Sequence, residues 1–160
     1  MKTRVTILAA MLLIAGVVAS CEEKVADVPK LTDGFSLDSV AYSLCSSQGD
    51  LLSLREYVKL SAVDNQTLRI EQDLTINCCC DSMRVNILPN DLNIVVDVAD
   101  YGNGCNCPCQ GFASYDVVGL VENTTYLFTF KRNNYERHTV SITFTTDVNQ
   151  TINLNGGNEL

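Results

Sequence analysis

Cysteine is the residue type with which this chain could do chemistry, and most of its 8 cysteines stand in two tight clusters. The first cluster is Cys78-Cys79-Cys80, and the second is Cys105-Asn106-Cys107-Pro108-Cys109. Cys21 and Cys45 stand apart from both. Thiols at such spacing can pair as disulfides, hold a metal ion as thiolates, or exchange disulfides with a partner thiol.

Disulfides are the first interpretation of the clusters. Adjacent side chains of a strand point to opposite faces, and side chains two apart lie near the upper Cα separation of about 6.8 Å that a disulfide allows. Bridges should therefore join one cluster to the other, or join Cys45 to a cluster. Cys21 is set aside because it follows an N-terminal signal, described below, in which it would carry lipid. Without Cys21, the 8 cysteines leave an odd number of candidates, so one stays unpaired. The candidates are Cys45, Cys78, Cys79, Cys80, Cys105, Cys107 and Cys109.

A zinc site is the alternative. Cys78, Cys80, Cys105 and Cys107 could supply four thiolates to a tetrahedral Zn²⁺ at about 2.3 Å. Neither cluster has the usual spacing of two residues between ligands, and the sole histidine, His138, lies far along the chain. The sequence therefore favours disulfides and no cofactor, with zinc as the alternative.

A thiol-redox role is the third interpretation, because a Cys-x-Cys pair can exchange disulfides. A reactive thiol needs a lowered pKa, which nearby positive charge provides. Here the expected neighbours are Asp81, Asp97 and Asp100, with only Arg84 to oppose them. Negative charge raises the pKa of a thiol, so these neighbours disfavour a redox site. We expect Asp97 and Asp100 to be solvated, since residues three apart in a strand face opposite ways.

A predicted hairpin brings the two clusters together. Pro89-Asn90-Asp91 is a turn signal between two alternating runs, residues 83–88 and 93–98. With the turn centred at Asn90, paired residue numbers sum to about 180, so position 80 should face position 100. The second cluster follows soon after, which places both clusters at the open end of the hairpin.

The hydrophobic pattern predicts an all-β fold. Apolar residues alternate with polar ones in many short runs, as in half-buried strands. Asn, Asp and Gly separate the runs, which is typical of an antiparallel β-sandwich. Only residues 50–60 have a helical stripe, so one short helix is allowed there. The runs include Phe35 and Leu37; Leu68 and Ile70; Ile94, Val96 and Val98; Tyr126, Phe128 and Phe130; and Val140, Ile142 and Phe144.

One stretch resembles immunoglobulin-like and transthyretin-like modules. It runs from Ser114-Tyr115-Asp116-Val117-Val118-Gly119-Leu120 to Thr125-Tyr126-Leu127-Phe128. In those modules a strand, a tight Gly-Leu turn and a second strand bury a tyrosine. The resemblance implies the same sandwich architecture and implies no activity.

The N-terminal residues are arranged like a bacterial secretion signal. Lys2 and Arg4 form a positive start, and residues 5–18 are almost all apolar, a run too short for an ordinary membrane span of about 20 residues. Val18-Ala19-Ser20-Cys21 then resembles the lipobox of bacterial lipoproteins. The resemblance implies cleavage before Cys21, acylation of Cys21, and anchoring to a lipid membrane through the acyl chains.

The expected domain organisation follows from the lipobox. Residues 1–20 are a lipoprotein signal peptide, residues 21–34 a lipidated tether, and residues 35–160 a single β-sandwich domain. Glu22-Glu23-Lys24 resembles the surface-export signal of lipoproteins from Gram-negative anaerobes. This resemblance implies attachment to the outer membrane of the cell envelope, on its surface or its periplasmic face.

The cysteine pattern also resembles small, uncharacterised lipoproteins of gut anaerobes, in which Asn-Cys-Cys precedes a hairpin and alternating cysteines follow it. This chain has Asn77-Cys78-Cys79 before the hairpin and the 105–109 cluster after it. It departs from the pattern in its third consecutive cysteine, Cys80, and in Gln110-Gly111-Phe112. The resemblance implies no activity.

Charge and motif content exclude several classes of function. A formal net charge of −8 repels phosphate backbones, so nucleic acid is not an expected partner. The sequence contains no nucleophile elbow, phosphate loop, dinucleotide fingerprint or zinc-protease motif. Asp38-Ser39-Val40 and Asp81-Ser82-Met83 match an O-glycosylation motif of the same bacterial group, so Ser39 and Ser82 are candidate acceptors.

The sequence therefore predicts a membrane-anchored, non-catalytic lipoprotein. It would act in the cell envelope as a binding or structural module, with an envelope protein or a glycan as its partner. The alternative is a thiolate metal-binding or thiol-redox lipoprotein, which the cysteine clusters would serve.

Overall fold

The computed structural model describes residues 24–25, 34–47, 56–103, 105 and 107–154. None of these segments is a helix long and apolar enough to cross a membrane. The strands of this part of the chain are β1 (Lys24–Val25), β2 (Ser36–Ser47), β3 (Tyr57–Ala62), β4 (Thr67–Asn77), β5 (Cys80–Asn90), β6 (Asn93–Gly102), β7 (Pro108–Val118), β8 (Thr124–Arg132), β9 (Tyr135–Phe144) and β10 (Asn149–Asn153).

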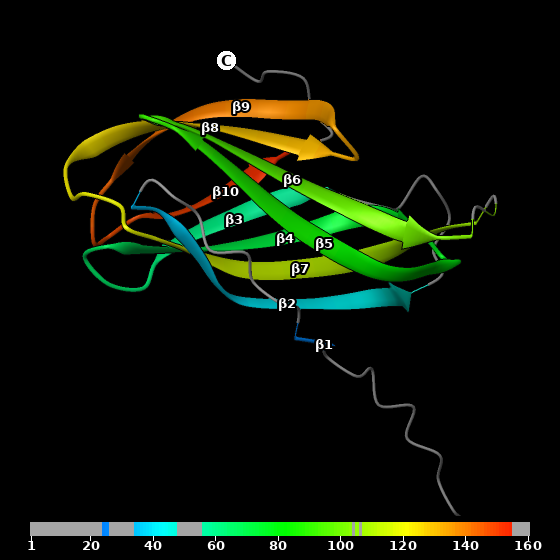
Figure 1. Cartoon of the computed structure of the whole chain (residues 1–160). Coiled ribbons are helices and arrows are strands. Elements are labelled where there is room, and N and C mark those ends of the chain that lie inside the picture. The colour runs from blue at the N-terminus through cyan, green and yellow to red at the C-terminus, as the bar shows by residue number, and fades with distance from the viewer. Residues whose placement is uncertain (1–23, 26–33, 48–55, 104, 106, 155–160) are drawn as a thin grey trace, which may run out of the picture.

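Two sheets pack face to face as a sandwich (Figure 1). The first has six strands in the order β1-β2-β7-β4-β3-β10, and the second has four in the order β5-β6-β8-β9. Neighbouring strands in the described part are antiparallel, except that β6 and β8 are parallel. The chain crosses to the first sheet for β7 and then returns, so β6 and β8 run the same way. The predicted all-β sandwich is confirmed, with this one parallel pair added.

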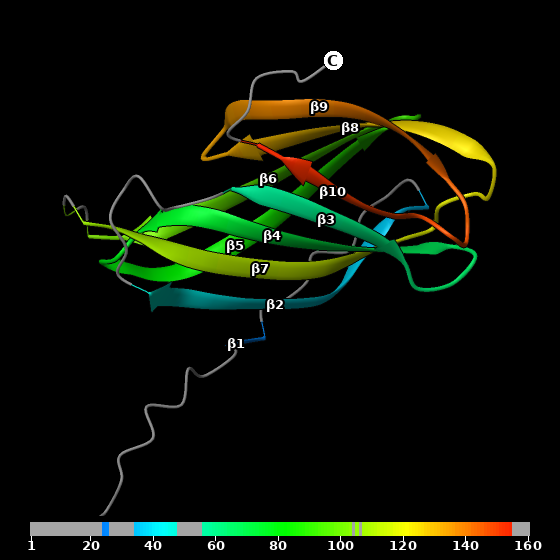
Figure 2. The same cartoon turned by 180° about the vertical axis from the view of Figure 1, so that it is seen from behind.

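The core lies between the two sheets. Along β4 every second residue from Leu68 to Ile76 is buried, because side chains alternate between the two faces of a strand. The facing strands of the second sheet contribute Val96 and Phe128, both fully buried. Each such side chain stabilises the fold by about 1.5–3 kcal/mol relative to exposure. Seen from behind, β10 and β3 close the first sheet beneath β9 (Figure 2).

The predicted hairpin is confirmed as β5 and β6, but its register differs from the expected one. The loop is Asp91-Leu92, and Asn90 pairs with Asn93. Asp91 has a φ of 54°, which suits a two-residue hairpin loop. Pro89 lies within β5, where it is tolerated because β5 is an edge strand. As a result, Cys80 faces Gly102, and the expectation that position 80 faces position 100 was wrong.

The short helix that the sequence allows within residues 50–60 is not present in the part of this stretch that the structure describes. Residues 57–60 belong to β3, and residues 48–55 lie outside the described part. Val58 and Leu60 are fully buried on the same face of the strand, which pairs with β4 on one side and β10 on the other. Pairing on both sides overrides the weak helical stripe.

The predicted signal peptide, residues 1–20, and Cys21 lie outside the described residues. Within the expected tether, residues 21–34, the structure places the short strand β1. Lys24 pairs with Tyr42 and Val25 pairs with Ala41 of β2. The chain therefore joins the first sheet at Lys24, close to the expected anchor.

The two buried tyrosines of the immunoglobulin-like stretch have different surroundings. The Tyr126 hydroxyl accepts a hydrogen bond from the Val121 backbone N–H at 2.9 Å and so fixes the turn between β7 and β8. The Tyr115 hydroxyl is buried and has no hydrogen-bond partner among the described residues. Burial raises the pKa of Tyr115 well above its ordinary value, so the hydroxyl stays protonated.

Removing the Tyr115 hydroxyl and removing the Tyr126 hydroxyl should have opposite effects on the free energy of unfolding. Tyr115→Phe should raise the free energy of unfolding by about 1 kcal/mol, because it removes an unsatisfied buried polar group. Tyr126→Phe should lower it by about 0.5–1.5 kcal/mol, because it removes a hydrogen bond. Urea unfolding of both variants beside the wild type measures the difference. Equal destabilisation by the two substitutions would mean that the Tyr115 hydroxyl has a partner.

Candidate functional site

Three cysteine pairs lie at disulfide-bonding distance. Their Cα separations are 5.2 Å for Cys45–Cys109, 5.4 Å for Cys78–Cys107 and 5.9 Å for Cys79–Cys105, all within the range for disulfides. Cys80 is the free cysteine of the described residues. The expectation that bridges run between clusters or from Cys45 to a cluster, with one thiol unpaired, agrees with this arrangement.

The ladder between β4 and β7 selects the partners within the two clusters. The strands end with Asn77 facing Pro108. The Cys78 backbone N–H continues the ladder by donating to the Cys107 carbonyl oxygen at 2.6 Å. Cys78 therefore faces Cys107, and Cys79, one residue further, meets Cys105.

Cys45 reaches its partner through an irregularity in β2. The pairing of β2 with β7 shifts register between Ser43 and Ser47. Cys45 lies in this shift with a φ of 48°, a value that few side-chain-bearing residues adopt. Such an irregularity re-aims a side chain, and here the bridge partner is the fully buried Cys109 of β7.

Gly102 allows the cysteine-bearing turn, which is Cys78 and Cys79 between β4 and β5, to approach the end of β6. A Cβ at this position would meet the Cys79 carbonyl oxygen and would lie 2.8 Å from the Asp81 backbone nitrogen. Both contacts are with backbone atoms, which cannot move aside as a flexible side chain can. Only glycine therefore permits the pairing of β6 with Cys80 at this point.

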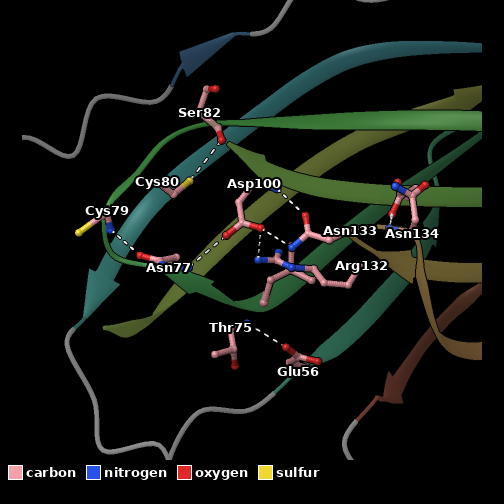
Figure 3. A network of polar contacts seen from close by, with 12 residues as sticks. Glu56, Thr75, Asn77, Cys79, Cys80, Ser82, Asp100, Arg132, Asn133 and Asn134 are labelled. Carbon is pink, nitrogen blue, oxygen red and sulfur yellow. Dashed lines mark hydrogen bonds and ion pairs between the residues drawn. The ribbon is translucent and has the colours of Figure 1, made fainter. Parts of the chain in front are cut away.

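A network of polar contacts joins the cysteine-bearing turn to the second sheet (Figure 3). The Asn77 backbone N–H donates to Asp100 Oδ2 at 3.2 Å. The Asn77 side chain accepts from the Cys79 N–H at 2.9 Å and donates to the Cys105 carbonyl. Asn77 thus holds one residue from each cysteine cluster and is itself held by Asp100.

Asp100 and Arg132 form a buried ion pair at the centre of this network. Arg132 Nη2 lies 2.9 Å from Asp100 Oδ1, with side chains 6% and 9% exposed. Asn133 donates to the same carboxylate oxygen at 2.6 Å and accepts from the Asp100 backbone N–H at 3.1 Å. The expectation that Asp100 is solvated was wrong, because β8, the neighbour of β6 in the same sheet, supplies the cation Arg132.

Asp97 is buried as well, on the other face of β6. Its carboxylate accepts from the Asn134 backbone N–H at 3.0 Å. The expectation that Asp97 is solvated was therefore also wrong. The turn between β8 and β9 provides a partner for both Asp97 and Asp100.

The electrostatics of the site keep Cys80 protonated. Burial raises the pKa of the Cys80 thiol, and the negative charge of Asp100 raises it further. Arg132 opposes this effect, so the cation near the cysteines is Arg132 and not Arg84 as expected. Arg84 instead lies over the Tyr101 ring, 5.3 Å from its centroid. A thiol with a raised pKa is a weak nucleophile at neutral pH.

The four predicted zinc ligands are not gathered into one site. Within the described residues, the sulfur atoms that cluster within 4.8 Å of one another belong to Cys78, Cys79 and Cys105. Each of these three also lies at disulfide distance from another cysteine. Cys80, part of the predicted zinc quartet, does not belong to this cluster.

A pocket of about 370 Å³ opens beside this network. Cys107 and Asn77 line it from the first sheet, and Arg132 and Arg137 line it from the second. Tyr135, whose side chain is 75% exposed, also lines it. The pocket volume falls near the lower end of the range of about 300–1,000 Å³ for small-molecule sites.

The remaining candidate residues lie elsewhere. Ser39 is exposed, and its backbone N–H is bound by the Asp38 carboxylate at 2.8 Å. Ser82 is half-buried, and its carbonyl lies 3.2 Å from the Cys80 sulfur. Ser39 is therefore the more accessible of the two predicted glycosylation sites. His138 is half-buried opposite Phe130 and takes no part in the site.

Arg132 is the site residue that sequence reasoning missed. The alternating run Tyr126, Phe128 and Phe130 on the inner face of β8 continues to Arg132, so the pattern itself places a cation on the buried face. Comparison with protein families, with curated proteins and with solved structures finds no match for this chain.

The cysteine pairing can be checked by mass. In a protein with Cys21 replaced by serine, reduction should add about 6 Da, and alkylation of the unreduced, denatured protein should label one thiol. Peptide mapping should recover the pairs Cys45–Cys109, Cys78–Cys107 and Cys79–Cys105, with the label on Cys80. A Cys80→Ser variant should take no label. A bridge that includes Cys80 would contradict the arrangement.

The buried carboxylate predicts an acid-sensitive fold. Burial alone would raise the pKa of Asp100, but the hydrogen bonds from Asn133 and Asn77 and the charge of Arg132 lower it below its ordinary value. The ionised form therefore stabilises the fold above the unfolded pKa, about 3.9, and this stabilisation is lost as the pH falls through the lower folded pKa.

Asp100→Asn should accordingly be less stable than the wild type at neutral pH, because it leaves Arg132 buried without its counter-charge. The difference between the two proteins should shrink as the pH falls below about 4. Urea unfolding across this pH range tests both statements. A difference that stays constant with pH would rule out a stabilising role for the ionised Asp100.

Proposed function

We propose that this chain is a membrane-anchored, non-catalytic binding module of the cell envelope. The observation that carries the proposal is the set of three cysteine pairs at one end of the sandwich, where Cys105 and Cys107 also line a pocket. Disulfides form and persist outside the cytoplasm and are rare within it. The lipobox resemblance at Cys21 supports the same compartment.

The chemistry of the pocket supports binding rather than catalysis. Asp100 and Arg132 neutralise each other, and the nearby Cys80 thiol is protonated. The carboxylate of Asp100 is held by Arg132 and the nearby thiol is protonated, so neither group is poised as a general base or a nucleophile. The bridges and the polar network hold the pocket walls in place, which lowers the entropy cost of binding.

The surroundings of this module are the lipid membrane and the outer face of the envelope. Acylation of Cys21 would attach the chain to the membrane, and Glu22-Glu23-Lys24 supports export to the outer membrane. The proposed binding partner of the anchored module is then an envelope protein or a glycan. The net charge of −8 opposes binding to nucleic acid.

Substituting the proposed acylation site tests the anchor. In a Gram-negative host, the wild-type protein should fractionate with membranes and have an intact mass increased by acyl chains. Cys21→Ser should leave the protein soluble, because no thiol remains to be acylated.

Cys80→Ser is the matched control, since it removes a free thiol without touching the lipobox, and it should stay with the membrane. A Cys21→Ser protein that still fractionates with membranes would overturn the proposed anchoring.

A further inference from the structure

We propose that the pocket beside Arg132 binds a small carboxylate-bearing sugar, such as a uronic acid. This inference rests on the proposed function as a binding module and names the ligand class of its site. It is argued from the charged groups that face the pocket, from an unsatisfied donor of Arg132, and from the aromatic side chain at the rim.

Half of the Arg132 guanidinium is unsatisfied. Its Nη2 pairs with Asp100, whereas its Nη1 is buried and has no hydrogen-bond partner among the described residues. A buried donor without a partner costs about 1–3 kcal/mol, and more if it is charged. A carboxylate oxygen of a ligand is an acceptor that matches a guanidinium N–H well. Arg132 is one of the residues that line the pocket.

A second arginine adds positive charge to the same pocket. Arg137 is exposed, lines the pocket, and by like-charge repulsion contributes to lowering the pKa of Arg132, after burial as the main cause. Among the lining residues the opposing carboxylate is Asp100, so the lining has an excess of one positive charge. Two neighbouring guanidiniums favour an anion between them.

The acidic groups around the pocket limit the strength of this attraction without reversing it. Glu56 also acts on Arg132, but it does not line the pocket, and its Oε1 accepts from the Thr75 backbone N–H at 3.1 Å. The net charge of −8 on the whole chain repels an anion at long range. This repulsion is screened beyond about 8 Å at physiological ionic strength, so the arginines at the pocket decide selectivity.

The rim of the pocket favours a sugar as the body of the ligand. Tyr135 is 75% exposed and lines the pocket, and an aromatic ring can cover the apolar face of a sugar. The volume of about 370 Å³ suits a small ligand and not a long polymer segment. Arg132 Nη1 is itself covered, whereas Tyr135 and Arg137 are exposed, so a ligand that enters the pocket meets these two side chains first.

Titration with matched sugars tests the assignment. The full-length protein in a non-ionic detergent is titrated with glucuronate, glucose and glucose 1-phosphate, and binding is followed by amide NMR shifts. Glucuronate should bind saturably and at least about tenfold more tightly than glucose, because only glucuronate can pair with the arginines. Glucose 1-phosphate distinguishes a carboxylate site from a general phosphate site. It should bind more weakly than glucuronate, because its charge of about −2 exceeds the single excess positive charge of the lining.

Substitutions at the rim locate the site. Arg137→Gln should weaken glucuronate binding about tenfold, since it removes one charge-assisted hydrogen bond from an exposed side chain. Arg84→Gln is the matched control with the same change of charge, because Arg84 does not line the pocket and it should leave binding unchanged. Arg132→Lys keeps the charge beside Asp100 but removes the second donor, and it should also weaken binding while the protein stays folded.

Each outcome bears on the ligand class. Equal weakening by Arg137→Gln and Arg84→Gln would show that net charge alone controls binding and would overturn the proposed site. No glucuronate binding, or tighter binding of glucose 1-phosphate, would overturn the carboxylate assignment. If glucuronate fails to bind while the wild-type protein remains acylated and membrane-bound, the ligand class is wrong and the anchored module stands.

Discussion

The buried ion pair between Arg132 and Asp100 is the interaction on which one end of the sandwich depends. Removing two charges from water costs several kcal/mol for each ion, so such a pair persists only where further hydrogen bonds satisfy it. Asn133 supplies one from the turn after β8, and Asn77 supplies another from the end of β4. These partners come from different sheets, so satisfying the charges also joins the sheets.

Beyond the apolar core, hydrogen bonds and disulfide bridges hold the end of the sandwich together. The core fills the middle of the sandwich, but Asn77, Cys78 and Cys79 follow the last buried apolar residue of β4, Ile76. Two bridges close loops with sequence separations of 29 and 26 residues at this point. Bridges of this size stabilise a fold by about 3–4 kcal/mol each in the chain-entropy description. The same residues that close the end of the sandwich also form one wall of its pocket.

Much of the fold follows from the sequence because alternation is a local property. The hairpin of β5 and β6, the inner faces of β4 and β8, and the meeting of the two cysteine clusters all come from residues near one another in the chain. The position of the hairpin loop did not follow, because the Pro89-Asn90 signal lies inside β5 and the loop forms at Asp91 and Leu92.

The site was less predictable, because it depends on pairings between distant strands. The choice of partners among the cysteines follows from the register of β4 against β7, which no short motif specifies. The pairing of Asp100 with Arg132 follows from the parallel contact of β6 with β8, an exception within an antiparallel fold. Alternation along β8 could have placed Arg132 on the buried face, but not beside its partner.

The bridge between Cys45 and Cys109 also determines how the chain would respond to mechanical tension. Load applied between the two termini enters β2 and crosses directly to β7 through the bridge, which spans a sequence separation of 64 residues. Strands β3 to β6 lie within that bypassed stretch, so the load cannot extend their backbone while the bridge is intact. Fully stretched, the oxidised chain is therefore shorter than the reduced chain by about 220 Å. Under such a load the chain before Cys45 and after Cys109 can be drawn out, whereas β6 with Asp100 lies within the closed loop and cannot be extended while the bridge is intact.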